Sequence, residues 1–171
     1  MHTDTDPAHP GQRRVGGLWL IMRDDRVLVV NPNYDDKTGK YQLVGGGARP
    51  DEPPHEAAVR EGLEEIGLPM VPHTLLVTDY MPANPDRGAV EGLNYVWLHR
   101  LGPDEKVTLN MGHEARGEKP ELVDFKLLSD GELDEHCAPY QARRIREAMA
   151  AAADPSRRGY LVRGRPVAEA E

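Results

Sequence analysis

Acidic side chains concentrate between positions 45 and 68, in the segment GGGARPDEPPHEAAVREGLEEIGL. Glu61, Glu64 and Glu65 stand at i, i+3 and i+4, so on a helix their side chains share one face. Carboxylates this close repel one another and weaken an isolated helix by roughly 0.2–0.5 kcal/mol per pair. A compensating cation is therefore expected, and hard oxygen ligands on a rigid element suit Mg²⁺ or Mn²⁺. The segment predicts a divalent metal site.

The same segment carries the signals of a helix start and a helix end. Pro53 and Pro54 fit only the first turn of a helix, and the side chain of Asp51 can cap free N–H groups there. Gly67 is the residue type that most easily takes the left-handed conformation at a helix C-terminus, and Pro69 blocks any continuation. We therefore expect a helix from about Pro53 to Gly67.

A second, apolar stripe runs along this helix. Val59, Leu63 and Ile66 stand at i, i+4 and i+7, and we expect them to pack on a sheet while the acidic face turns to a cleft or to solvent. Gly62 lies in the helix interior, where glycine costs about 0.5–1 kcal/mol relative to alanine. Two interpretations stay open: a weak spot in the helix, or a close approach by another backbone or a ligand.

The spacing of these residues resembles the Nudix box. The pattern is Gly46, five residues, Glu52, seven residues, Arg60-Glu61, two residues, Glu64-Glu65, one residue, Gly67-Leu68. Such a spacing is far more specific than a lone glycine loop. Gly62 departs from the box, which usually carries an aliphatic residue there, but every carboxylate of the pattern is present.

The resemblance implies a fold and a chemistry. The fold would be an α/β/α sandwich with a mixed β-sheet over residues 14–153. The activity would be metal-dependent hydrolysis of a diphosphate linkage in a nucleoside diphosphate derivative or a related organic diphosphate, by attack of water on phosphorus. Such a pyrophosphohydrolase would use Mg²⁺ or Mn²⁺.

The resemblance also implies roles for single residues. The implied metal ligands are the backbone carbonyl of Gly45 and the side chains of Glu61, Glu64, Glu65 and Glu118. Arg60 would orient the carboxylates by charge-assisted hydrogen bonds. Glu61 or Glu118 would take the proton of the attacking water, and Glu52 would secure the turn between loop and helix.

The loop from Asn110 to Pro120 is the expected source of a further glutamate, because family members commonly supply one from a loop here. Glu118 is the first candidate and Glu114 the second; for either, an ordinary solvated loop acid stays an alternative. Glu121, at the start of the next predicted strand, is expected to have a structural role.

The elements that must position these residues follow from the apolar pattern. The runs VGGLWLIM and VLVVN flank a polar turn at Arg23–Arg26 and predict a β-hairpin. Further strands are expected at Tyr41–Val44, Thr74–Tyr80, Leu93–Leu101 and Glu121–Leu128, and a last helix at Pro139–Ala153. This order fits a mixed sheet between helices.

Two sets of side chains on these elements allow two interpretations each. Tyr95 and Trp97 share one face of a predicted strand, where they could pack in the core or stack on a base. Arg143, Arg144 and Arg146 predict an exposed basic face on the last helix, either solvated or attractive to an anionic substrate.

Length and charge bound the class of protein. A chain of 171 residues is expected to form one domain, with a disordered tail over 1–13 and a tail over 154–171 that could add a strand. The net charge of −8 argues against a general nucleic-acid binder and favours a small-molecule diphosphate as partner. The chain has one cysteine and no apolar run of membrane-spanning length, so no internal disulfide and no membrane contact are expected.

The remaining expectations concern location, assembly and a rival function. The N-terminal segment is polar and lacks an apolar signal region, so the cytoplasm is the expected location. A homodimer stays open. Substrate choice should rest on loops such as 31–40 and 81–92. The alternative function is a catalytically silent Nudix domain that binds a nucleotide or metabolite as a sensor.

Overall fold

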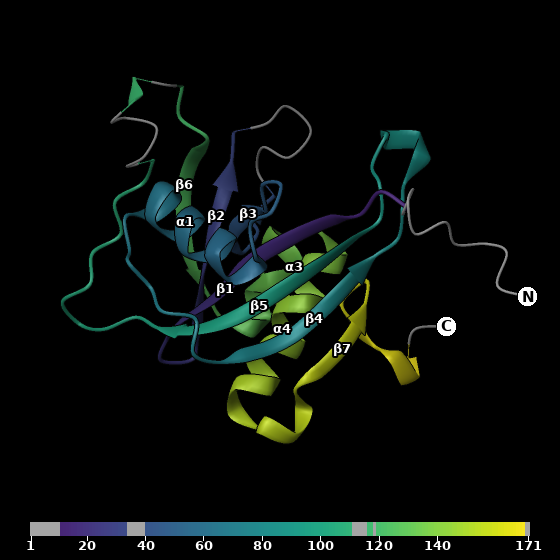
Figure 1. Ribbon diagram of the computed structural model, residues 1–171. Coiled ribbons are helices and arrows are strands. Elements are labelled where there is room, and N and C mark those ends of the chain that lie inside the picture. The colour runs from purple at the N-terminus through teal and green to yellow at the C-terminus, as the bar shows by residue number, and fades with distance from the viewer. Residues whose placement is uncertain (1–10, 34–39, 111–115, 118, 170–171) are drawn as a thin grey trace, which may run out of the picture.

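A mixed β-sheet lies between helices in the computed structural model, which describes residues 11–33, 40–110, 116–117 and 119–169. Helix α1 (Pro54–Ile66) crosses one face of the sheet, while α3 (Leu133–His136) and α4 (Pro139–Ala153) lie on the other (Figure 1). The predicted α/β/α sandwich is confirmed. No helix in the described ranges has the length and apolar character needed to cross a membrane.

The sheet has the order β6-β2-β1-β5-β4-β7-β8, with β3 beside β1. Pairs β1/β5 and β4/β7 are parallel and the other pairs are antiparallel. The strands are β1 (Arg14–Arg23), β2 (Arg26–Pro32), β3 (Val44–Gly47), β4 (Leu75–Met81), β5 (Gly92–Arg100), β6 (Leu122–Leu128), β7 (Gly159–Val162) and β8 (Arg165–Pro166). Short 3₁₀ turns lie at Pro85–Arg87, Asp130–Glu132, Pro155–Arg157 and Val167–Glu169.

Each face of the sheet has its own core. Along β1, Leu18 and Leu20 belong to the core under α4, whereas Trp19 and Ile21 belong to the core under α1. Because both faces are covered, the strand is apolar without interruption instead of alternating with polar residues. The indole Nε1 of Trp19 donates a 2.6 Å hydrogen bond to the Ala58 carbonyl and so ties β1 to α1.

One edge of β1 is shared by two strands. β2 pairs with its C-terminal part and β3 with residues 16–19, so the glycine segment is itself a strand. The third strand was expected at Tyr41–Val44, and this prediction is wrong in its bounds: β3 covers Val44–Gly47, while Tyr41 and Gln42 make only isolated bridges. The glycines allow this close packing, because a Cβ on Gly45 would lie 2.2 Å from the Gly17 carbonyl oxygen and a Cβ on Gly17 would lie 2.0 Å from the Pro54 carbonyl oxygen. Only side-chain-free backbone brings β1, β3 and α1 this close.

Helix α1 ends at the predicted residue, but the face that packs on the sheet is not the predicted one. Gly67 takes the left-handed conformation at φ 71°, while no side-chain hydrogen bond from Asp51 caps the start. Leu63 is 46% exposed, so the predicted packing stripe is wrong at this residue. The buried residues are Ala57, Ala58, Gly62, Glu65 and Ile66. Small residues let α1 lie directly on the glycines of β1, and this turns Leu63 outward.

Gly62 is a contact point and not a gap in the packing. A Cβ there would lie 2.6 Å from Cε of Met70 and 3.2 Å from Nε1 of Trp19. Both neighbours belong to the core under α1. The structure therefore shows a close approach at Gly62 that neither interpretation named, because side chains of the core make it.

Helix α4 spans the predicted residues, with Ala142, Ile145, Ala148 and Ala151 buried against the sheet. The predicted basic face is wrong for Arg144, which is buried and donates a 2.6 Å hydrogen bond to Asp79 on β4. Arg144 lies one residue from the buried stripe, and its long side chain reaches a carboxylate that the sequence places far away. The predicted added strand after residue 154 is confirmed as β7, which pairs with β4.

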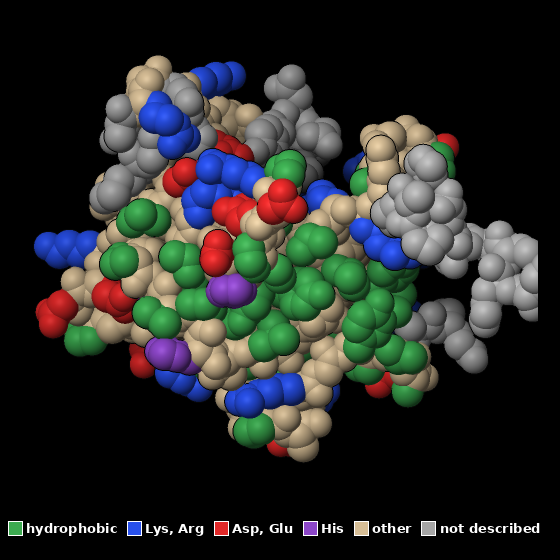
Figure 2. Space-filling model, in the orientation of Figure 1, with side chains coloured by type: hydrophobic (Ala, Val, Ile, Leu, Met, Phe, Trp, Pro, Cys, Tyr) green, Lys and Arg blue, Asp and Glu red, His purple; other side chains and the backbone are tan. Residues whose placement is uncertain are grey.

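The aromatic pair on β5 packs in the core. Trp97 is buried under α1, and the Tyr95 ring stacks on it with centroids 6.0 Å apart. An apolar area continues over β4 and β5 beside α1 (Figure 2). A hollow of about 480 Å³ there is lined by Leu75, Tyr95, Tyr160 and neighbouring residues and contains no carboxylate.

Candidate active site

A cleft of about 580 Å³ opens where β3, α1, β5 and the start of α4 come together. One end of it is lined by the glycine strand 45–47 and by Glu61, Glu65 and Glu121. Three carboxylates from α1 and the start of β6 thus share one concave surface. The sequence separates Glu121 from Glu61 widely, so the sheet and not the helix brings them together.

The glycine strand holds two of these carboxylates in place. The backbone N–H of Gly45 donates a 2.8 Å hydrogen bond to Oε2 of Glu65. A Cβ on Gly46 would lie 2.7 Å from Oε1 of Glu61, so only glycine leaves room for this carboxylate over the backbone of β3. The Gly45-Gly46 pair therefore sets the position of both glutamates.

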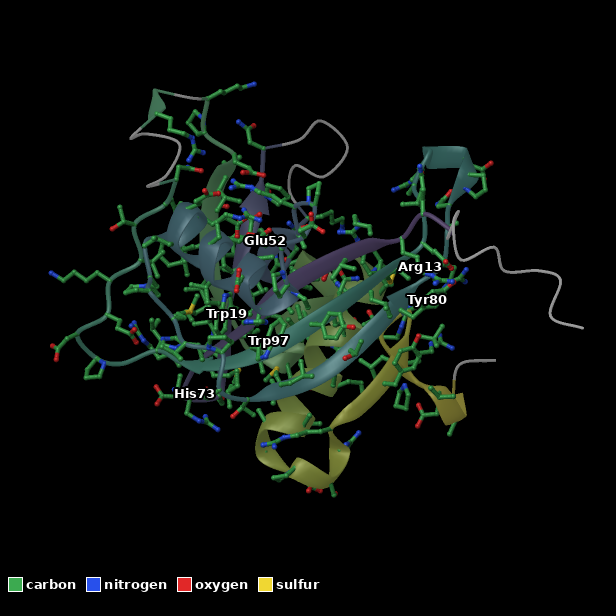
Figure 3. All side chains as sticks on the ribbon, in the orientation of Figure 1. Arg13, Trp19, Glu52, His73, Tyr80 and Trp97 are labelled. Carbon is green, nitrogen blue, oxygen red and sulfur yellow. The ribbon has the colours of Figure 1, made fainter. Side chains whose placement is uncertain are left out.

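Arg60 connects the carboxylates to the turn. Its Nε and Nη2 donate to the two oxygens of Glu52 at 2.8 and 2.9 Å, and Nη1 donates to Glu61 at 2.7 Å and to Glu64 at 3.4 Å. Nη2 also donates to the carbonyl of Gly47. Glu52 lies at the glycine-strand end of α1 (Figure 3). This bidentate fork fixes the angle between the helix and the strand.

Burial and neighbouring charges shift the pKa values of the glutamates at this end of the cleft. Burial raises the pKa of Glu65 well above its usual range, and the charges of Glu61 and Glu121 raise it further. Burial also raises the pKa of Glu61, although Arg60 opposes this. In contrast, the hydrogen bonds from Arg60 lower the pKa of Glu52 to about 2. A cation bound between Glu61 and Glu65 would relieve the repulsion that they share.

Glu121 is a residue whose place sequence reasoning missed. It was expected to be structural, yet it lines the cleft and its charge acts on Glu61 and Glu65. Asn110 explains the placement of Glu121. Its side-chain Oδ1 accepts from the backbone N–H groups of Glu121 and Leu122, and its backbone N–H donates to the Glu65 carbonyl. This link between β6 and α1 is long-range, and the local pattern around Glu121 carries no sign of it.

The other predicted loop acids lie outside the described residues. Glu118 and Glu114 were the first and second candidates to complete the site, so both stay predictions. Glu64 lies near the cleft on α1 but faces cations: Arg60 at 3.4 Å, and Arg49 and Arg116 at 3.7 Å each. To reach an ion beside Glu61 it would have to leave these partners.

The donor set fits a hard divalent ion. Carboxylate and backbone carbonyl oxygens are the ligands that Mg²⁺ and Mn²⁺ prefer. Within the described ranges, no three His, Cys, Asp or Glu side chains already form an ion cage. Glu61 and Glu65 instead accept from Arg60 and Gly45. An ion held by both glutamates would therefore require their side chains to turn away from these partners.

The fold is an α/β domain with a mixed sheet between helices. The glycine strand β3 precedes the acidic helix α1, and both line a cleft that is rich in carboxylates. The chain belongs to the NUDIX domain family, since the sequence model of that family matches residues 11–148. The resemblance found in the sequence is thereby confirmed.

Two curated relatives match shorter stretches. The CTP pyrophosphohydrolase of Escherichia coli (strain K12) is 38% identical over 50 residues, which is 29% of this chain and 37% of that protein. The RNA pyrophosphohydrolase of Rickettsia prowazekii (strain Madrid E) is 41% identical over 54 residues, 32% of this chain and 34% of that protein. The chain thus spans about a third of the length of these relatives.

Solved structures match over most of the chain. The MutT NUDIX hydrolase from Burkholderia pseudomallei has a TM-score of 0.64 at 22% identity, over 81% of this chain and 97% of that one. The E. coli ORF135 protein has a TM-score of 0.64 at 21% identity, over 85% and 96%. At these identities the likeness shows the fold.

Proposed function

We propose that this chain hydrolyses a diphosphate linkage in a nucleoside diphosphate derivative or a related organic diphosphate, by attack of water on phosphorus. The observation that carries the proposal is the burial of Glu61 and Glu65 against the glycine strand, with Glu121 in the same cleft. Burying like-charged carboxylates is costly unless a cation offsets it. Membership of the NUDIX family and the similarity to two pyrophosphohydrolases support the same chemistry.

The proposal gives each residue a role. Glu61, Glu64, Glu65, the Gly45 carbonyl and Glu118 would hold Mg²⁺ or Mn²⁺. The ion would neutralise charge on the phosphoryl oxygens and lower the pKa of a water.

Proton transfer and positioning fall to neighbouring side chains. Glu61 or Glu118 would accept the proton of the water, and Glu121 joins them as a candidate because it lines the same end of the cleft. Arg60 is a positioning residue in this scheme, because its hydrogen bonds keep Glu61 over the glycine strand.

A small molecule is the proposed substrate class. The two curated relatives are named for CTP and for RNA, so both kinds of substrate occur among similar proteins. The net charge of −8 opposes binding of a long phosphate backbone, which needs clustered Lys and Arg. We also propose the cytoplasm as the place of the reaction.

A substrate panel tests the proposal. Nucleoside triphosphates, ADP-ribose, dinucleoside polyphosphates and prenyl diphosphates are incubated with the chain and Mg²⁺ or Mn²⁺, and products are identified by phosphorus NMR. We expect cleavage of at least one compound and its loss in EDTA. Binding without any product would instead support the silent sensor domain, and cleavage that persists in EDTA would contradict the metal's role.

A further inference from the structure

The cleft has a second end, which begins beside the glycine strand. It is lined by the start of β1, by the loop that follows β4, by β5 and by the start of α4, through Arg14, Arg87, Asn94, Tyr140 and Gln141. Besides Glu61, Glu65 and Glu121, no carboxylate lines the cleft among the described residues. A group joined to a diphosphate at the glycine strand would extend into it.

Asn94 is the unusual residue of this end. It is 3% exposed and lines the cleft, yet its Nδ2 is buried without a hydrogen-bond partner in the described part of the chain. Buried amide donors are nearly always paired, so an unpaired one next to a cleft points to an acceptor from outside the chain.

The backbone holds the Asn94 amide in place. Asn94 stands opposite Gly16 on β1, and a Cβ on Gly16 would lie 2.7 Å from its Oδ1 and 3.3 Å from the Gly46 carbonyl oxygen. The oxygen of the amide therefore lies over Gly16, beside the glycine strand. Its cross-strand neighbour Asp79 is already occupied, since it accepts from Arg144 at 2.6 Å and from the Gly164 N–H at 2.9 Å.

Arg14 adds positive charge to the same wall. Its neighbour Arg13 is paired with Glu91 at 2.5 Å and lies beside Tyr80, where β1 begins and β4 ends (Figure 3). Arg14 itself has no carboxylate within ion-pair distance among the described residues, whereas the nearby Arg144 is neutralised by Asp79. Burial and the charge of Arg144 lower the pKa of Arg14, and an anion beside it would oppose both effects by stabilising the charged guanidinium.

We propose that this end of the cleft binds an anionic, acceptor-rich group of the substrate, a phosphate monoester or a carboxylate, through Nδ2 of Asn94 and the guanidinium of Arg14. The inference rests on the proposed hydrolysis for the diphosphate that joins this group to the glycine strand. An uncharged aromatic base fits less well. The Tyr140 ring is the aromatic ring lining this part of the cleft, and Arg144 already lies over it at 5.6 Å.

Substrate pairs that differ by one anionic group test the inference. NADPH carries a phosphate that NADH lacks, and UDP-glucuronate carries a carboxylate where UDP-glucose has a hydroxymethyl group. We measure kcat/KM and, by calorimetry with Ca²⁺ in place of Mg²⁺, Kd for both pairs. The wild-type chain should favour the charged member of at least one pair by about tenfold or more, because charge-assisted contacts discriminate on that scale.

Three variants and one control connect the preference to the two residues. Arg14→Gln should bring the ratio close to one. Asn94→Asp keeps the shape but replaces the donor by a carboxylate, so it should disfavour the charged member. Asn94→Leu should lower the ratio without lowering the melting temperature, because it removes an unpaired buried donor. Arg13→Gln, next to Arg14 but paired outside the cleft, should keep the wild-type ratio.

The outcomes separate this inference from the proposed reaction. Turnover of both members at equal kcat/KM, or a preference unchanged in Arg14→Gln and Asn94→Asp, overturns the inference and leaves hydrolysis standing. If no compound is cleaved, the reaction fails and the Kd values decide the inference. Tighter binding of the charged member that is lost in Arg14→Gln supports it, and equal or undetectable binding of both members overturns it.

Discussion

Arg60 connects the glycine strand, the start of α1 and the acidic face by hydrogen bonds to Gly47, Glu52, Glu61 and Glu64. Both Arg60 and Glu52 are largely shielded from solvent, with side chains 17% and 14% exposed. Two parallel N–H···O bonds in such a setting are stronger than a surface ion pair. The pair stabilises the site through geometry as well as charge.

Glu52→Gln should therefore lower the free energy of unfolding at pH 7 by about 1–3 kcal/mol, the usual cost of losing a hydrogen bond to a charged group. The pKa of Glu52 falls from 4.5 in the unfolded chain to about 2 in the folded protein. Its contribution is thus fully present above about pH 4.5 and is lost as pH falls towards 2. Urea unfolding of both proteins between pH 7 and 3 measures this.

The difference between wild type and Glu52→Gln should shrink as the pH falls. A difference that stays constant over this range, or grows towards acid, contradicts the assigned ion pair. Glu56→Gln is the matched control, because Glu56 lies on the same helix but is exposed.

At the scale of elements, the bounds of the helices were predictable and their faces were not. Proline and glycine act on their own backbone, so the end of α1 at Gly67 and the whole of α4 follow from local sequence. Which face packs depends on partners far away in the chain. Leu63 turns outward because α1 packs directly on Gly17. Arg144 turns inward because the buried Asp79 accepts its hydrogen bond.

Gly62→Ala tests the packing of α1. Alanine favours helix by about 0.5–1 kcal/mol, but a Cβ would lie 2.6 Å from Met70 Cε and 3.2 Å from Trp19 Nε1. Met70 Cε ends a flexible side chain and can shift, whereas the indole is held by its hydrogen bond to Ala58, so overpacking should cost about 1–3 kcal/mol. The net effect should be a loss of about 1 kcal/mol, or about 2–4 °C in melting temperature. Met70→Leu, which removes the colliding atom, should recover part of the loss in the double variant. A higher melting temperature for Gly62→Ala would show that glycine is a weak spot.

The candidate site shows the same division between local and distant information. The carboxylates of α1 and the glycines before it are close in sequence, so their proximity was predictable. Glu121 and Asn94 reach the cleft through the pairing of β6 with β2 and of β5 with β1. Such non-local strand order cannot be deduced from the alternation within a strand. Glu118 and Glu114 stay predictions, since they lie outside the described residues.

At the scale of the whole molecule, the C-terminal segment completes the sheet. Leu161 on β7 is 3% exposed in the core under α4, and the Arg163 N–H donates to the Tyr80 carbonyl. Gly164 supplies the second hydrogen bond to Asp79. Residues 159–164 are thus part of the folded domain, although the family match ends at residue 148.

Leu161→Ala should accordingly destabilise the protein by about 2–4 kcal/mol, the cost of truncating a buried leucine. Tyr160→Ala, at the adjacent but half-exposed position, should cost less than about 1 kcal/mol. Thermal unfolding of both variants gives the comparison. Equal and small effects would mean that β7 does not belong to the cooperative unit.

The central claim is that the carboxylates beside the glycine strand hold the ion that drives hydrolysis. The most direct test is kcat of Glu65→Gln at saturating Mg²⁺, on the fastest compound of the panel, with Glu56→Gln as control. Gln still accepts from the Gly45 N–H but carries no charge, so kcat should fall by about two or more orders of magnitude while the melting temperature does not fall. A Glu65→Gln chain that keeps the wild-type kcat would contradict the account.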